Sequence, residues 1–330
     1  MHILLGGNPE MKEFFGYKDM SPEEFRELQL IELDMLLYFD NFCREHGLRY
    51  YLAGGTLIGA VRHKGFIPWD EDIDLHMPRP DYDRLPALWN KDADTEKYTL
   101  CITDREHNFR HHVYTICNNN TTMIEERTVN DDIPQGIRID ILPWDGVPAN
   151  RLKAGVQFMW AILYSIYNVQ RLPENQGGKA MRYGVAAALN LVRNPDMRYK
   201  IWTHAQDEMR KYDFDGNCKY VRELASPLRA MQFKYPRKDF DKPVMVDFEG
   251  HKFPAQHYYL QYLNNYYPGF MTPPPVEKRV QKTRAIYINL EKGYKEYKGI
   301  YYCIDQPNAP GKNDKRKRVK KATSKRKKSS

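Results

Sequence analysis

The chain has 330 residues, of which 42% are hydrophobic, and it carries a formal net charge of +8. This length is sufficient for a large core and an accessory region. Residues 312–328 contain eleven Lys or Arg and one Asp, which leaves the other residues with a net charge of −2. The basic character therefore belongs to the tail and does not identify the body as a nucleic-acid-binding domain.

The cysteines favour a reducing compartment. There are five, none in a CxxC pair, which argues against a zinc knuckle and a disulfide scaffold. The first residues do not have the pattern of a signal peptide. Residues 154–170 carry no charge but are short for a membrane span, which needs roughly 20 apolar residues. They predict a core helix, with an interfacial helix as the alternative.

The first predicted element is a helix that begins at Ser21 and stops at Gly47. Ser21 and Glu24 have the spacing of a capping box, and Pro22 suits the first helical position. Apolar side chains then recur at helical spacing, at Phe25, Leu28, Ile31, Met35, Tyr38, Phe39 and Phe42.

Short elements follow in the order strand, turn, helix, strand, helix. The expected ranges are 49–53, 56–64 with Thr56 as the cap, 73–77 and 81–89. Their β-branched and aromatic content predicts further strands near 98–102, 111–117, 121–125 and 137–142. This order is typical of an α+β fold with a mixed β-sheet flanked by helices.

The second half of the chain is predicted to be mostly helical. Long apolar runs indicate helices over 151–211, and a mixed region with a turn at 248–250 precedes a short helix over 257–267. Residues 312–330 have the composition of a disordered tail. We therefore expect a catalytic core over 1–150, a mostly helical region over 151–310 and a disordered basic tail over 311–330.

The pair Asp72 and Asp74 carries the most specific chemical signal. Positions i and i+2 of a strand share a face, so both carboxylates project together while Ile73 and Leu75 enter the core. Two adjacent carboxylates repel unless a positive charge lies between them. Their hard oxygen atoms suit Mg²⁺ or Mn²⁺.

A glycine turn, Gly54-Gly55, precedes the predicted helix at Thr56. Glycines at a helix start allow an anion to approach free backbone N–H groups, although a purely structural turn is the alternative. Arg62 and His63 follow this helix and offer positive charge for phosphate groups. The alternatives are a structural ion pair for Arg62 and an ordinary surface or core position for His63. A phosphate pocket beside a metal site indicates phosphoryl transfer.

Asp140 is the third acidic candidate, because it lies in an apolar strand between Ile139 and Ile141. Burying an aspartate there is costly unless it is paired or metal-bound. We expect it to be a third metal ligand or a general base, against a structural Asp bonded to the backbone. Asp70 and Glu71 are expected to support the site or to face solvent.

Three stretches resemble the LicD family, which belongs to the DNA polymerase beta-like nucleotidyltransferase superfamily. Residues 52–62, LAGGTLIGAVR, and 67–74, IPWDEDID, resemble its signature. Residues 139–148, IDILPWDGVP, resemble its middle block, and residues 253–274 resemble its C-terminal block loosely. Arg138 departs from the pattern, and its two interpretations are a substrate contact and a partner for Asp145.

The resemblance implies a nucleotidyltransferase-like core and a Mg²⁺-dependent phosphotransferase. Such an enzyme moves a phospho-alcohol, most often phosphocholine, from a CDP-activated donor to a hydroxyl of a cell-surface glycan, and it releases CMP. The acceptor classes are lipopolysaccharide, teichoic acid and capsule precursors. The implied catalytic and metal residues are Asp72, Asp74 and Asp140, and the implied donor-phosphate residues are Gly54, Gly55, Thr56, Arg62 and His63.

Two rival functions remain: a nucleotidyltransferase that moves NMP from NTP to a small molecule, and a non-catalytic protein of glycan assembly. The expected partners are the CDP-alcohol donor and a glycan or lipid-linked saccharide acceptor. We expect no specific nucleic acid, a cytoplasmic location, and peripheral contact of the basic tail with anionic membrane. Tyrosine pairs such as Tyr266-Tyr267 offer an aromatic cage for a quaternary ammonium, although tyrosine is also ordinary packing material.

Overall fold

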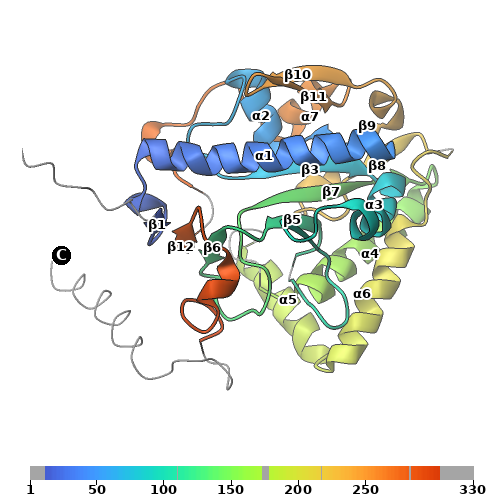
Figure 1. Ribbon diagram of the computed structural model, residues 1–330. Coiled ribbons are helices and arrows are strands. Elements are labelled where there is room, and N and C mark those ends of the chain that lie inside the picture. Colours follow the sequence, from blue (N-terminus) through green and yellow to red (C-terminus); the bar gives the residue numbers. More distant parts are fainter. Residues whose placement is uncertain (1–11, 110, 173–177, 217, 282–283, 305–330) are drawn as a thin grey trace, which may run out of the picture. The chain divides into compact units, whose positions relative to one another are not determined.

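The computed structural model describes residues 12–109, 111–172, 178–216, 218–281 and 284–304 (Figure 1). The predicted basic tail lies outside these residues. The chain forms two compact units, each assembled from separate stretches of sequence. The first comprises residues 1–31, 117–137 and 281–330, and the second comprises residues 32–116 and 138–280.

The first unit contains a three-stranded antiparallel sheet in the order β1-β12-β6. Tyr287 of this sheet packs against Tyr301, with 4.2 Å between ring centroids. The elements of the unit are β1 (Glu13–Phe14), the 3-10 helix η1 (Tyr17–Asp19), β6 (Thr122–Glu125), β12 (Ala285–Asn289) and the 3-10 helix η5 (Tyr294–Tyr297).

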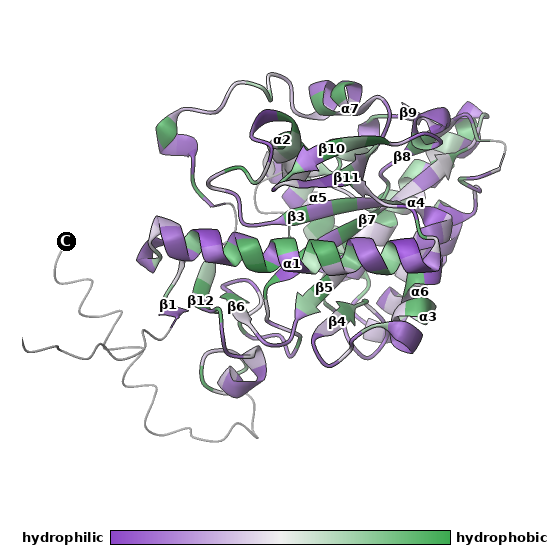
Figure 2. Ribbon diagram, turned by 45° about the horizontal axis from the view of Figure 1, so that its top comes forward, coloured by the Kyte–Doolittle hydropathy of each residue, from purple (hydrophilic) through white to green (hydrophobic). Residues whose placement is uncertain are grey.

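Helix α1 (Pro22–His46) begins in the first unit and belongs to the second from Glu32 onward. Its predicted capping box is confirmed: the Glu24 N–H donates to Ser21 Oγ at 3.2 Å, and the Ser21 N–H donates to Glu24 Oε2 at 2.6 Å. Hydrophobic and hydrophilic residues alternate along the helix (Figure 2). Met35, Leu36 and Phe39 are buried on its apolar side, as the spacing predicts.

The second unit is built on a mixed sheet in the order β2-β3-β7-β5-β4, to which β8 and β9 are joined at β7. Strands β3 and β7 are parallel, whereas β2 and β8 run antiparallel to their neighbours. The predicted α+β fold with a mixed sheet is therefore confirmed. The strands are β2 (Tyr51–Leu52), β3 (Ile73–Pro78), β4 (Tyr98–Cys101), β5 (Tyr114–Asn118), β7 (Arg138–Val147), β8 (Tyr220–Arg222) and β9 (Tyr235–Pro236).

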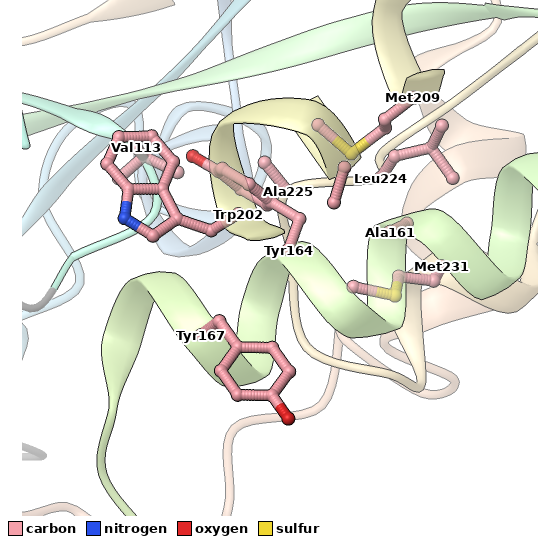
Figure 3. Packing of buried hydrophobic residues seen from close by; sticks show 10 residues of the cluster. Val113, Ala161, Tyr164, Tyr167, Trp202, Met209, Leu224, Ala225 and Met231 are labelled. Carbon is pink, nitrogen blue, oxygen red and sulfur yellow. The ribbon is translucent and has the colours of Figure 1, made fainter. Parts of the chain in front are cut away.

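Helices α4 and α6 pack together in this unit, and their buried side chains form a common cluster (Figure 3). Ala161 and Tyr164 of α4 meet Trp202 and Met209 of α6 there. The helices of the second unit after α1 are α2 (Gly54–Arg62), α3 (Arg79–Asp92), α4 (Arg151–Val169), α5 (Gly178–Leu191), α6 (Pro195–Arg210) and α7 (Tyr259–Tyr266).

The uncharged stretch 154–170 is mostly helix α4, which is a core helix on one side only. Ala161 is fully buried, whereas Leu152, Val156 and Met159 are exposed on the other side. Within the described residues, no helix combines the length and apolarity that a membrane crossing requires.

The region after α6 is mixed and contains a short helix, as predicted. Strands β8 and β9 are followed by a hairpin of β10 (Val244–Phe248) and β11 (His251–Ala255), and α7 is the one regular α-helix among the described residues of this region. The predicted turn at 248–250 joins this hairpin, with positive φ at Glu249 and Gly250. The short 3-10 helices of this region are η2 (Ala230–Gln232), η3 (Arg237–Phe240) and η4 (Val276–Lys278).

Candidate active site

The register of β3 and β7 brings two of the predicted aspartates together. Asp74 and Asp140 are partners across the two parallel strands. The residues on either side of them, Ile73, Leu75 and Ile139, are at most 1% exposed, so alternation turns both carboxylates to the opposite face of the sheet. This side-by-side placement is the geometric centre of the candidate site.

The start of α2 packs against Asp74. The Ala53 N–H donates to the Asp74 carbonyl at 3.0 Å, and the Asp74 N–H donates to Thr56 Oγ1 at 2.9 Å. Gly54 has φ +48°, and a Cβ on it would lie 2.4 Å from Asp74 Oδ2. Only glycine therefore allows this helix start to approach the carboxylate so closely.

The role expected of Thr56 as a helix cap is wrong. Helix α2 begins at Gly54, after Ala53, so Thr56 already lies in the first turn. Its hydroxyl accepts from the backbone of β3 and thereby fixes the carboxylate strand to the helix. The glycine pair belongs to the first turn of the helix and does not precede it, so the close contact with Asp74 is made by the helix itself.

Asp140 is held from the neighbouring strand β5. Thr115 Oγ1 donates to Asp140 Oδ1 at 2.6 Å, and His111 Nδ1 lies 3.8 Å from Asp140 Oδ2. These contacts fix the orientation of the carboxylate and leave it partly exposed. The pair of Asp140 and His111 was not predicted as a unit, because the two residues lie on different segments of the chain.

Asp72 precedes β3 and lies beside a buried acidic residue that the motif did not contain. Glu32 of α1 is fully buried, and neither of its carboxylate oxygens has a hydrogen-bond partner in the described part of the chain. Burial raises its pKa well above the ordinary range, and the charges of Asp72, Glu71 and Asp70 raise it further. Glu32 interrupts the apolar stripe midway between Leu28 and Leu36, and this interruption was the available sequence signal.

Asp70 and Glu71 are buried, so the alternative that they face solvent is wrong. They join Glu32 and Asp72 in one acidic cluster, and the charge of Arg138 acts on Glu32 from the same neighbourhood. The alternative role of Arg138 as the partner of Asp145 is also wrong. Arg79 fills that role, with two hydrogen bonds of 2.6 and 3.0 Å to the Asp145 carboxylate.

Tyrosines of the α7 region face the same carboxylates. The Gly54 N–H lies 3.4 Å from Tyr262 Oη, which accepts it weakly. Burial raises the pKa of Tyr267 well above the ordinary value, and the negative charges of Asp74 and Asp72 act in the same direction. Burial also raises the pKa of Tyr266, and the negative charge of Asp74 adds to this effect. The site therefore combines acidic groups with an aromatic wall.

Arg62 and His63 lie at the other end of α2, about 12 Å from Gly54 at the helical rise per residue. Arg62 donates through Nη1 to the Phe270 carbonyl and through Nε to His63 Nδ1 at 3.3 Å. Its guanidinium and that of Arg279 lie over the Trp69 ring, at 6.0 and 5.1 Å. Burial lowers the pKa of Arg62, and the charge of Asp70 acts in the opposite direction.

The carboxylate oxygens at the site suit a hard divalent cation. Asp74 and Asp140 are neighbours, and Asp72 shares the strand parity of Asp74. Among the described side chains, however, no three His, Cys, Asp or Glu converge as a preformed metal site. The residues fit the cation in kind, so metal binding by Asp72, Asp74 and Asp140 stays a prediction.

Comparison with known proteins gives a family match for one part of the chain. Residues 47–145 match the family described as "LicD/FKTN/FKRP, nucleotidyltransferase domain". This match includes Gly54, Asp72, Asp74 and Asp140, whereas Glu32 and the tyrosines of α7 lie outside it.

Two kinds of relative extend the comparison. The chain is 28% identical over 259 residues to the "Lipopolysaccharide cholinephosphotransferase LicD" of Haemophilus influenzae, which covers 76% of this chain and 93% of that protein. It is 62% identical over 47 residues to the "Ribitol 5-phosphate transferase FKRP" of Homo sapiens and of Mus musculus, which covers 14% of this chain and 10% of those proteins. The similarity to the LicD protein thus extends well beyond the LicD domain match.

Proposed function

We propose that this protein transfers a phospho-alcohol, phosphocholine in the first instance, from a CDP-activated donor to a hydroxyl of a cell-surface glycan. The observation that carries the proposal is the register pairing of Asp74 with Asp140 inside the LicD domain match. The similarity along most of the H. influenzae cholinephosphotransferase supports the choice of substrate class.

In the proposed reaction, an acceptor hydroxyl forms a new bond to the phosphorus of the phospho-alcohol. The bond from that phosphorus to the oxygen of CMP breaks, and CMP leaves with the electron pair. Asp140 takes the proton of the acceptor hydroxyl, since its carboxylate is oriented by Thr115 and remains partly exposed. The reaction needs little other covalent chemistry from the protein.

We assign the metal role to Asp72, Asp74 and Asp140, with Mg²⁺ or Mn²⁺ as the cation. When bound, such a cation neutralises phosphate charge and lowers the pKa of an attacking hydroxyl. Gly54 and Gly55 would offer backbone N–H groups to the donor diphosphate. Thr56 is also assigned to the donor phosphate, since its hydroxyl accepts from the Asp74 N–H and keeps its own proton to donate.

Arg62 and His63 are proposed to meet the donor at the far end of α2, next to Trp69. The tyrosines near Asp74 are suited to the choline end of the donor, since aromatic faces attract quaternary ammonium groups. A cytoplasmic location, a lipid-linked saccharide acceptor and membrane contact by residues 312–328 also belong to this proposal.

The test is CMP release by the purified full-length protein with CDP-choline, CDP-ribitol, CDP-glycerol and CDP-ethanolamine, in the presence of Mg²⁺ and a glycan acceptor extract. We expect release from one donor. Asp74→Ala and Asp72→Ala should each lower the rate by about 100-fold or more, as removal of a group that stabilises transition-state charge does. Asp247→Asn is the control, because Asp247 is exposed and pairs with Lys252.

The family description also names a nucleotidyltransferase, which supports a second candidate function. Pyrophosphate release from an NTP, with no CMP from any CDP-alcohol, would contradict phospho-alcohol transfer and establish nucleotidyl transfer. Undiminished function in cells after Asp72→Ala and Asp74→Ala together would instead indicate a non-catalytic role.

A further inference from the structure

An open cavity lies in the second unit, and its charged side chains are basic, whereas those of the candidate active site are acidic. Its volume is about 340 Å³. Helix α4 contributes Arg151, Gly155 and Phe158 to its wall, and Arg222 and Lys234 line it from the segment that begins with β8. Volumes of this size are typical of small-ligand sites.

Arg222 is the central side chain of this cavity. It is 8% exposed, and its buried Nε has no hydrogen-bond partner among the described residues. Its guanidinium lies over the Phe158 ring at 5.3 Å, and only burial, without any carboxylate, shifts its pKa, in the downward direction. A buried guanidinium without an acceptor is costly, so some group outside the described residues is expected to compensate it.

The nearest carboxylate by strand register is already engaged. Arg222 is paired with Asp145 across β8 and β7. The Asp145 carboxylate, however, accepts two hydrogen bonds from Arg79, which is itself almost fully buried. Asp145 therefore balances Arg79, and Arg222 turns to the cavity instead.

The cations of the cavity also repel one another. The pKa of the Lys234 ammonium is lowered, first by burial and then by the positive charges of Arg222 and Arg151. No acidic residue lines the cavity in the described part of the chain. Arg151 and Lys234 are exposed beside the buried Arg222, and three cations around an open cavity without a carboxylate favour an anion there.

This cavity is distinct from the carboxylate site. Arg222 adjoins β7 at Asp145, five residues beyond Asp140, which is about 16 Å along an extended strand. None of Arg151, Arg222 and Lys234 falls within the LicD domain match at 47–145. A ligand here would bind beside the chemistry and would not take part in it.

We propose that the cavity formed by α4, Arg222 and Lys234 is a binding site for the phosphate group of a second ligand. Arginine forms bidentate hydrogen bonds to phosphate oxygens, and lysine adds a compact positive charge. This pair of side chains therefore suits a phosphate group better than an uncharged apolar ligand. The phosphate can belong to a soluble phosphoester or to a lipid headgroup. The exposed Leu152, Val156 and Met159 on the same helix make the lipid source worth a separate arm of the test.

The test measures binding of inorganic phosphate, glycerol 3-phosphate and dioctanoyl phosphatidic acid to the full chain by calorimetry, at matched ionic strength. Arg222→Met should weaken binding about tenfold or more, because it removes charge-assisted hydrogen bonds. Gly155→Leu keeps every cation and fills the cavity. A Cβ at Gly155 meets nothing within 4 Å, so this variant is expected to fold and to lose binding.

Lys153→Gln is the matched control, because Lys153 is an exposed residue of α4 that does not line the cavity. It should bind phosphate as the unchanged protein does, which separates the cavity from non-specific attraction. Tighter binding of the phosphatidic acid than of glycerol 3-phosphate, lost in Gly155→Leu, would identify a lipid headgroup. Equal binding of the two would identify a soluble phosphoester.

If Gly155→Leu and Lys234→Gln bind all three probes as the unchanged protein does, the proposal is overturned, whatever the behaviour of Arg222→Met. Transfer activity is a separate readout, because none of these residues belongs to the carboxylate site. Loss of CMP release in Asp74→Ala with phosphate binding intact would leave the proposed site unaffected.

Discussion

The two ends of strand β7 differ in how buried charges are arranged. Near its start, Asp140 lies beside Asp74 and close to an acidic cluster in which Glu32 has no hydrogen-bond partner among the described residues. Near its end, Asp145 is matched by Arg79. A matched buried pair serves the fold, whereas an excess of like charge with a perturbed pKa is typical of a functional site.

The same comparison separates the arginines that border the end of β7. Arg79 is buried against a carboxylate, and Arg222 is buried without one. The acidic start of β7 and the basic cavity at its end thus share one property, an excess of a single sign of charge. The following predictions test whether matched and unmatched groups really behave differently.

The largest effect is expected at the matched end. Arg79→Met should lower the free energy of unfolding by about 3–5 kcal/mol, because it leaves the Asp145 carboxylate buried and unpaired. Denaturant unfolding measures this change. Arg79→Met combined with Asp145→Leu should recover part of the loss, and Arg84→Met, at a largely exposed side chain, should change little. A double variant as unstable as the single one would show that the pair is not the cause.

At the acidic start of β7, a substitution is expected to raise the free energy of unfolding instead of lowering it. Glu32→Gln should raise the free energy of unfolding by about 1–3 kcal/mol in a chelating buffer at neutral pH, because burial and the neighbouring carboxylates disfavour the ionised form of Glu32, so that folding must either bury its charge or protonate it. Glu45→Gln, on an exposed part of the same helix, is the control. A loss of stability in Glu32→Gln would mean that the carboxylate is compensated in the protein and would break the comparison.

A smaller effect is expected where α2 approaches Asp74. Gly54→Ala should cost about 1–2 kcal/mol in left-handed backbone strain and should also displace the Asp74 carboxylate. The transfer rate should therefore fall further than the stability. Gly184→Ala in α5 is the control, since its Cβ meets open space and alanine favours the helix. Equal losses in rate and in folded fraction would argue against a positioning role for Gly54.

The smallest effect concerns a matched pair at the surface. Arg49 and, to a lesser extent, Arg237 lower the pKa of Asp215 below its ordinary value of about 3.9. Its stabilising contribution is therefore present above that value and is lost as the pH falls through the lowered pKa. Asp215→Asn should cost at most about 1 kcal/mol at neutral pH and nothing near pH 2. In an Arg49→Met background, this pH-dependent difference should shrink.

Much of the fold was predictable because local rules decided it. The capping box at Ser21 and Glu24, the alternation around Asp74 and the hairpin turn at Gly250 each depend on residues close in sequence. The mixed sheet followed from the order of the elements. The start of α2 was missed because a tertiary contact, Asp74 against Gly54, overrode the usual cap signal of Thr56.

The candidate site was predictable in part, since the neighbouring positions of Asp74 and Asp140 follow from two strand patterns. Glu32 was not in the motif, because it reaches the site through packing of a distant segment, whereas Tyr266 and Tyr267 belonged to the loosely resembling C-terminal block. The partner of Asp145 was misassigned for the same reason, as strand parity alone does not indicate that Arg79 reaches it. The unbalanced cations around Arg222 left no local signal, because single arginines occur throughout the chain.

The shared register of β3 and β7 has a consequence for redesign of this chain. Residues 79–137 separate the two strands and include a helix, three strands and a portion of the first unit. Lengthening a loop within that stretch leaves the frame of either strand unchanged, so Asp74 and Asp140 keep their places. One residue inserted inside either strand would turn one carboxylate to the opposite face. Grafting experiments should therefore transplant the two strands as one unit and keep Arg79, His111 and Thr115 from the intervening segment, because they contact Asp145 and Asp140.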